Sequence, residues 1–156
     1  MGARRRSREV ALQALYQMEM SGRKPVESLE VLCRHFEVSD RAEGYARELV
    51  EGIAGKWDEI NDRIRRCAAN WRLERMTVID RNIIRLAVYE LCCRDDVPPR
   101  VAINEAVELA KKYGTGESGA FINGVIDAVN RAGGGRAGDA PEDDAPEDDG
   151  REAAGG

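Results

Sequence analysis

The segment TVIDRNIIRLAVYEL, residues 77–91, decides the fold class. Its apolar residues Ile79, Ile83 and Leu86 recur at helical spacing and fall on one face. Thr77 is a favoured residue immediately before a helix, and Asp80 stands at the third helical position after it. No stretch of the chain alternates apolar and polar residues over the length of a strand. We therefore predict an all-α protein, built outward from this helix.

The same spacing predicts further helices on both sides of this segment. Their apolar stripes lie within residues 5–20, at Leu29–Phe36, at Ala46–Ile53, at Trp57–Cys67, at Ala102–Tyr113 and at Ile122–Val129. Together with residues 77–91 they make about seven helices. The connections between them are only a few residues long, as in helical bundles.

Residues that begin and end helices stand between these stripes. Asp40 followed by Glu43 is typical of a capping box and predicts the start of the third helix. Pro98 and Pro99 precede the sixth helix, in which proline suits the first turn. Glycines at 22, 55 and 114 follow apolar stripes, and we expect Gly114 to cap the sixth helix.

Most of the aromatic residues lie on the apolar stripes, and we expect them in the core. These are Tyr16, Phe36, Tyr45, Trp57, Trp71, Tyr89 and Tyr113. Phe121 is different, because it follows a glycine-rich turn at the start of a helix. There a ring can face solvent and stack on an unpaired base.

The chain divides into a body and an acidic tail. Its 156 residues are 42% hydrophobic and 34% charged, which suits one domain with a core. Residues 133–156 contain the repeated APEDD, eight acidic residues and two arginines, and so carry a net charge of −6. Residues 1–132, with 22 basic and 21 acidic side chains, carry +1. We predict a folded domain over 1–132 and a disordered tail over 133–156.

Several classes of protein are disfavoured by composition. No run approaches the roughly 18 to 20 apolar residues of a membrane helix, and no signal-peptide core follows the first arginines. The four cysteines form no C-x-x-C, and His35 is the one histidine, so we expect no metal site. We expect a cytoplasmic protein without a cofactor and without a membrane partner.

The turn GTGESG at residues 114–119 matches the dinucleotide fingerprint G-x-G-x-x-G. That motif needs a preceding strand, and here a helix precedes it. It also lacks the lysine of a phosphate-binding loop, and no residue pattern indicates catalysis, so we expect no enzyme. The amides near Ser118 and Gly119, at the start of the last helix, instead form a positive pole that suits a phosphate.

The densest positive charge lies at the beginning of the chain, in Arg4, Arg5, Arg6 and Arg8. One interpretation is a frayed, solvated terminus. The other is a mobile arm that grips a nucleic-acid backbone, since guanidinium groups make paired hydrogen bonds with phosphate.

Three segments together resemble the NusB family of bacterial transcription antitermination factors. They are RRRSREVALQALY at 4–16, IDRNIIRLAVYEL at 79–91, and VAINEAVELAKKYG at 101–114 followed by FINGV at 121–125. The resemblance runs from about residue 3 to residue 131. It implies two small helical bundles packed together. It also implies a protein that pairs with the ribosomal protein NusE, binds the boxA element of nascent ribosomal RNA, and joins RNA polymerase with other antitermination factors.

The resemblance also points to particular residues. It assigns the RNA surface to Arg4, Arg5, Arg6, Arg8, Ser118 and Phe121, with Lys111 nearby as a further phosphate contact. It assigns the contact with the protein partner to Tyr16 and Asp80. The arginines and the turn before the last helix are then expected to converge on one face. The alternative is a helical protein-interaction scaffold without direct RNA contact, and the free protein is expected to be a monomer or a homodimer.

Overall fold

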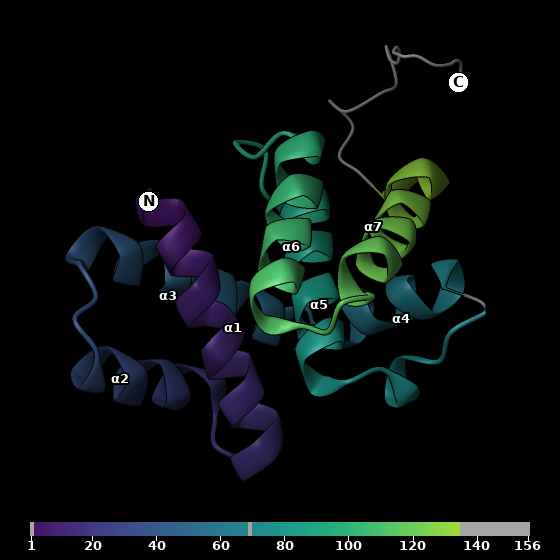
Figure 1. Ribbon diagram of the computed structural model, residues 1–156. Coiled ribbons are helices and arrows are strands. Elements are labelled where there is room, and N and C mark those ends of the chain that lie inside the picture. The colour runs from purple at the N-terminus through teal and green to yellow at the C-terminus, as the bar shows by residue number, and fades with distance from the viewer. Residues whose placement is uncertain (1, 69, 135–156) are drawn as a thin grey trace.

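The structure is a computed structural model that describes residues 2–68 and 70–134 (Figure 1). These residues form seven α-helices and no strand, which confirms the predicted all-α fold. The helices are α1 (Ala3–Ser21), α2 (Pro25–His35), α3 (Asp40–Gly55), α4 (Trp57–Cys67), α5 (Val78–Cys93), α6 (Pro99–Tyr113) and α7 (Ser118–Val129). Residues 135–156, most of the predicted acidic tail, lie outside the described part.

The helices form two groups. Helices α1, α2 and α3 pack on one another, and α4 to α7 pack around α5. Figure 1 shows the first group on the left and the second on the right, with α1 and α5 where they meet. This arrangement confirms the two packed bundles that the resemblance implied.

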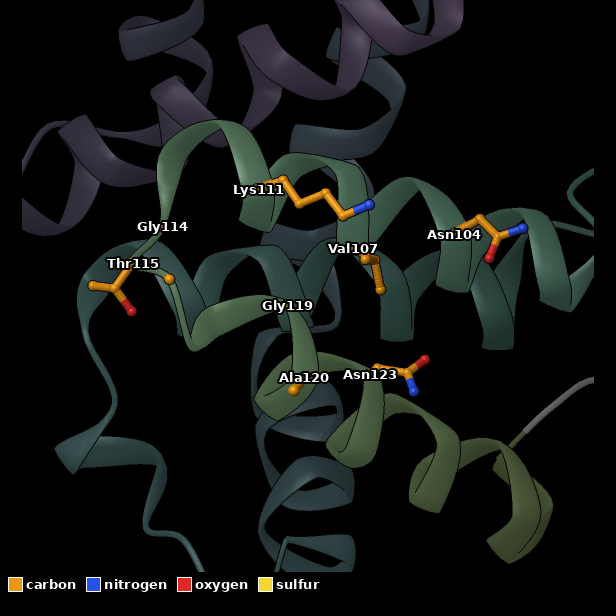
Figure 2. Close-up of a pocket in the computed structure, with 9 residues that line it drawn as sticks. Asn104, Val107, Lys111, Gly114, Thr115, Gly119, Ala120 and Asn123 are labelled. Carbon is orange, nitrogen blue, oxygen red and sulfur yellow. The ribbon is translucent and has the colours of Figure 1, made fainter.

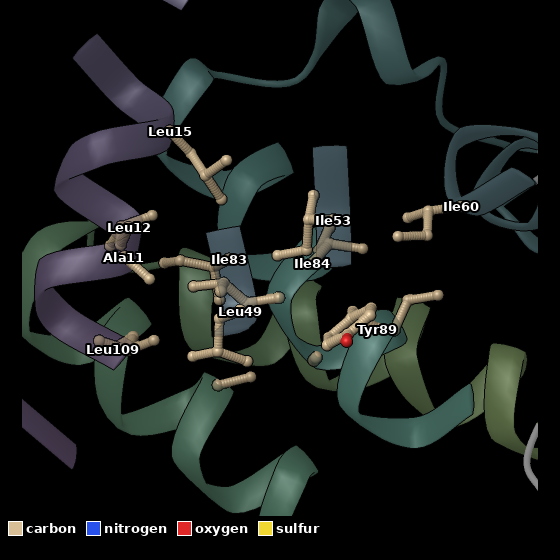
Figure 3. Packing of buried hydrophobic residues seen from close by; sticks show 14 of the residues in the cluster. Ala11, Leu12, Leu15, Leu49, Ile53, Ile60, Ile83, Ile84, Tyr89 and Leu109 are labelled. Atoms are coloured by element: carbon tan, nitrogen blue, oxygen red, sulfur yellow. The ribbon is translucent and has the colours of Figure 1, made fainter. Parts of the chain in front are cut away.

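One apolar core runs through both groups. In Figure 3, Leu12 and Leu15 of α1 lie beside Ile83 of α5. All three side chains are almost completely buried, as are Leu49 and Ile53 of α3. Burying each such side chain contributes roughly 1.5 to 3 kcal/mol. The core therefore holds α1, α3 and α5 together as one unit.

The helix ends follow local hydrogen bonding. The Thr77 hydroxyl accepts a hydrogen bond from the Asp80 N–H at 3.0 Å, as predicted. The capping box predicted at Asp40 and Glu43 is wrong. Ser39 caps α3, its hydroxyl accepting from the Ala42 N–H at 3.1 Å. Asp40 is therefore the first helical residue, where its carboxylate lies near the positive end of the helix.

Three aromatic residues that we expected in the core are exposed: Tyr16, Phe36 and Trp71. Phe36 is 53% exposed because α2 ends at His35 and the backbone of Phe36 is extended, so the helical spacing no longer directs its side chain. Trp71 is 49% exposed and lies in the connection between α4 and α5. Both errors extend a helical period beyond the end of its helix.

A buried ion pair joins the start of α1 to the end of α5. The Arg8 guanidinium donates from Nε to both carboxylate oxygens of Glu90, at 3.1 and 3.0 Å. The Tyr45 hydroxyl of α3 donates to the same carboxylate. Burial raises the pKa of Tyr45, and the Glu90 charge raises it further. Tyr45 therefore stays protonated, and three helices meet at one satisfied buried carboxylate.

A second ionic cluster joins the other ends of the same two helices. Glu19 of α1 accepts hydrogen bonds from Arg81, Asn82 and Arg85 of α5. Burial acts to raise the pKa of Glu19, but the hydrogen bonds from Arg81 and Asn82 and the charge of Arg85 hold it below its ordinary value. The Arg85 guanidinium also lies over the ring of Trp57 on α4, 4.1 Å from its centre. The two clusters fix α1 and α5 antiparallel.

In residues 2–68 and 70–134, none of the helices has both the length and the apolar character that crossing a bilayer requires.

We expect Arg8→Ala to destabilise the protein by about 3 to 5 kcal/mol, because it leaves the Glu90 carboxylate buried without its cation. Urea unfolding followed by circular dichroism measures this loss. Arg131→Ala is the control, since the pair between Arg131 and Asp127 is exposed and its loss should cost less than about 0.5 kcal/mol. Equal stabilities of the two variants would contradict a structural role for Arg8.

Candidate functional site

The arginines at the start of the chain belong to a helix. Helix α1 begins at Ala3, so the four arginines lie on a helix, and neither the frayed terminus nor the mobile arm describes their conformation. Arg4 pairs with Asp96 at 2.6 Å, and Arg5 makes a two-pronged contact with Glu105 at 3.0 and 2.7 Å. The carboxylates hold these side chains against the connection after α5 and against α6.

Burial separates the four arginines. The side chains of Arg4 and Arg5 are each 45% exposed, and that of Arg6 is 34% exposed. A guanidinium has five N–H donors, so a paired arginine keeps donors for a ligand. The Arg8 side chain is only 6% exposed and is used by Glu90. Burial therefore argues against Arg8 as an RNA contact, whereas Arg4, Arg5 and Arg6 remain available.

The pairing changes the electrostatics of this surface. The hydrogen bond from Arg4 lowers the pKa of Asp96 to about 2. The hydrogen bond from Arg5 likewise lowers the pKa of Glu105. Both carboxylates are ionised at neutral pH and offset much of the arginine charge. The surface consequently has only a weak net positive charge. What it provides to a ligand is a set of oriented hydrogen-bond donors.

The turn between α6 and α7 is built around Ser118. Its hydroxyl accepts a hydrogen bond from the Thr115 N–H at 2.9 Å, and its side chain is buried. Gly114 caps α6, as predicted, but its backbone is extended and has no positive φ. A Cβ at Gly114 would lie 2.5 Å from the Ser118 hydroxyl oxygen and 2.9 Å from the Ala110 carbonyl oxygen. Close packing therefore requires glycine here.

The two segments meet at one carboxylate. Glu9 of α1 accepts from Arg6 at 3.3 Å and from Lys112 of α6 at 2.7 Å. Lys112 stands two residues before Gly114. The arginine segment therefore lies beside the last turn of α6, which leads into the α6–α7 turn. That the two regions form one RNA surface stays a prediction.

An open groove with a volume of about 620 Å³ lies between α6 and α7 beside the turn (Figure 2). Val107, Gly119 and Ala120 give it apolar surface, and Lys111 lies at its α6 side. Asn104 and Asn123 also line it, and sequence analysis missed both. For Asn104 the sequence carried a signal, because helical spacing places residues 104, 107 and 111 on one face of α6.

The ring of Phe121 is half-buried at the start of α7. It packs against the ring of Trp71, with centroids 5.4 Å apart and planes at 79°. Its place beside the turn agrees with the sequence analysis, but its exposure is smaller than we expected. The proposed stacking of Phe121 on a base stays a prediction.

Tyr16 and Asp80 lie elsewhere, near the end of α1 and the start of α5. Tyr16 is exposed, and so is Met20 one turn further along α1, which sequence analysis missed. Asp80 directly precedes Arg81 in α5. Arg81 donates a hydrogen bond to Glu19, which lies between Tyr16 and Met20 in α1. One carboxylate oxygen of Asp80, Oδ1, is buried without a hydrogen-bond partner in the described part of the chain. Tyr16 and Met20 therefore give the end of α1 an exposed, partly apolar surface.

Within the described ranges, no three histidine, cysteine or acidic side chains gather as metal ligands would.

Comparison with known proteins gives a consistent result. The NusB family model matches residues 5–131. The chain is 52% identical over 133 residues to transcription antitermination protein NusB of Myxococcus xanthus, covering 83% of this chain and 95% of the relative. It is 46% identical over 138 residues to the protein of the same name from Desulfosudis oleivorans, covering 86% and 90%.

Solved structures of related proteins have the same fold. T. maritima NusB superposes with a TM-score of 0.76 at 38% identity, over 82% of this chain and 90% of that one. A crystal structure of antitermination factors NusB and NusE in complex with dsRNA gives a TM-score of 0.74 at 30% identity, covering 83% and 97%.

We expect Gly114→Ala to open the turn, because the added Cβ would overlap the Ser118 hydroxyl and the Ala110 carbonyl. Such overpacking typically costs about 1 to 3 kcal/mol, which urea unfolding measures. Gly116→Ala is the matched control, since a Cβ there meets nothing within 4 Å. Equal destabilisation by the two substitutions would show that close packing at Gly114 is unimportant.

Proposed function

The chain belongs to the NusB family, and from this premise we propose that it is an RNA-binding transcription antitermination factor. In this role it pairs with the ribosomal protein NusE, binds boxA of nascent ribosomal RNA and joins the elongating RNA polymerase complex. It acts in the cytoplasm and catalyses no reaction. The observation that supports the RNA surface is that Arg6 of the arginine segment and Lys112, in the last turn of α6 before the α6–α7 turn, share the Glu9 carboxylate.

The phosphate contacts come from two kinds of donor. Arg4, Arg5 and Arg6 present exposed guanidinium groups along the first turns of α1. Ser118 contributes through the turn that it holds, since its own hydroxyl is used by Thr115. The amides of Gly119 and Ala120, which follow it, have no backbone acceptor in the described residues. These unpaired amides at the helix start attract an anion.

The groove beside the turn is the place where a base is recognised. Side-chain amides both donate and accept, so Asn104 and Asn123 can each pair with a base edge. Lys111 lies in the same groove and supplies a phosphate contact. In this arrangement Lys111 positions the RNA through its phosphate, and Asn104 and Asn123 select the base through its edge.

The surface for the protein partner is formed by Tyr16, Met20 and Asp80. Exposed aromatic and methionine side chains are typical of the centre of protein interfaces. Asp80 as a residue is partly exposed at the start of α5, so its carboxylate can accept a hydrogen bond from the partner. Tyr16 and Met20 lie toward the end of α1, whereas the arginine segment lies at its start.

The double variant Arg5→Ala with Arg6→Ala tests the RNA surface. We expect weaker binding to boxA-containing RNA, and a log–log slope of affinity against salt reduced by up to about 1.4, at roughly 0.7 per lost phosphate contact. Filter binding across a series of salt concentrations measures both. Arg34→Ala with Arg131→Ala is the charge-matched control. Unchanged affinity and slope would favour the scaffold without RNA contact.

The partner surface predicts a different pattern. Tyr16→Ala should weaken binding to NusE by roughly tenfold or more, since truncating a large interface aromatic is often this costly. It should leave the affinity of the protein alone for RNA unchanged. Calorimetry with each ligand separates the two effects, and Phe36→Ala controls for loss of an exposed ring. Equal NusE affinity of Tyr16→Ala and wild type would place the partner elsewhere.

A further inference from the structure

The connection between α4 and α5 displays a tryptophan on an anchored backbone. The backbone N–H of Trp71 donates a hydrogen bond to the backbone carbonyl of Ala68 at 2.9 Å. Leu73 and Met76, which follow it, are buried in the core. A short 3-10 turn over Leu73–Arg75 fixes the backbone between these anchors. Trp71 is therefore held in place, yet about half of its surface is open to solvent.

Trp71 is continuous with the α6–α7 turn. Its ring contacts Phe121, which stands three residues after Ser118. This contact partly covers Phe121, so the larger exposed aromatic surface at this end of α7 belongs to Trp71. Trp71 is therefore an exposed ring that adjoins Phe121 and, through it, the α6–α7 turn.

The charge around Trp71 differs from that at the start of α1. Arg66, Arg72 and Arg75 are all exposed. In the part of the chain that the structure describes, none of these three forms an ion pair, whereas Arg4, Arg5 and Arg6 are each paired with a carboxylate. Only Arg65 of this region is paired, with Asp62 and Glu74. Positive charge without an ion-pair partner in the described residues therefore lies within five positions of Trp71 on either side in the sequence.

We propose that Trp71, with Arg66, Arg72 and Arg75, forms a second RNA contact, in which an unpaired base stacks on the indole and the arginines bind the flanking phosphates. Exposed aromatic rings within a basic surface are the usual means of holding single-stranded nucleic acid. The excess of positive charge suits a polyanion better than a mixed protein surface. The inference rests on the proposed RNA-binding function and extends its surface from the turn to the α4–α5 connection.

Tryptophan fluorescence reads this contact directly. The chain has two tryptophans, and Trp57 is half-buried under the Arg85 guanidinium. In a Trp57→Phe background, emission therefore comes from Trp71 alone. Titration with boxA-containing single-stranded RNA should quench this emission and protect it from collisional quenching by acrylamide. The same titration with NusE and no RNA should do neither.

Substitution measures how much the contact contributes. Trp71→Ala should weaken RNA binding about 5- to 150-fold, the range for loss of one stacked base. Trp71→Phe should retain most of the affinity, because it keeps an aromatic face. Phe36→Ala should change nothing, and circular dichroism verifies that each variant is folded.

The outcomes separate the inference from the function. If the wild type binds RNA but neither the emission of Trp71 nor the affinity of Trp71→Ala responds, the inference is overturned and the proposed function stands. If Trp71→Ala weakens NusE binding and leaves RNA binding intact, the surface is a protein contact and the inference is overturned as well. If the wild type binds no RNA, alone or with NusE, the proposed function itself fails.

Discussion

Buried pairing of opposite charges between α1 and α5 holds the two bundles in register. Arg8 reaches Glu90 at one end, and Glu19 receives Arg81 and Arg85 at the other, so charges alternate between the helices. Each carboxylate is fully hydrogen-bonded, which is the condition under which buried ions are tolerated. Sliding either helix along the other would leave a charge buried without its partner. The apolar core alone would not impose so strict a register.

That register determines what the start of α1 can do. Because α1 is fixed against α5 and α6, Arg4 and Arg5 lie within reach of Asp96 and Glu105. The carboxylates order the guanidinium groups before any ligand arrives, which lowers the entropy lost on binding. They also offset positive charge, which lowers long-range attraction. On the proposed function, this surface favours correct placement of RNA over rapid capture.

Most local features were predictable from sequence, although the cap of α3 was assigned to Asp40 instead of Ser39, and the distant features were not. Helical spacing and the Thr77 cap depend on neighbouring residues, so they were read correctly. The same spacing failed for Phe36 and Trp71, because both lie outside the helices that precede them. The role of Arg8 depends on Glu90, 82 positions away, and no local pattern signals it. For the candidate site, the sequence pointed to the arginine segment and the turn, whose contacts with RNA stay a prediction. It did not point to Asn104 and Asn123, whose place in a groove depends on how α6 and α7 pack.

The carboxylate of Glu9 is shared by Arg6 and Lys112 and is itself almost inaccessible to solvent. A phosphate that draws Lys112 away would leave both oxygens to Arg6, and one that draws Arg6 away would do the reverse. Occupancy of either segment thus alters the electrostatic state of the other. By thermodynamic linkage, the two must influence each other's affinity equally. On the proposed function, Glu9 would therefore couple the two neighbouring contact regions, because the carboxylate that one cation releases pairs more strongly with the other.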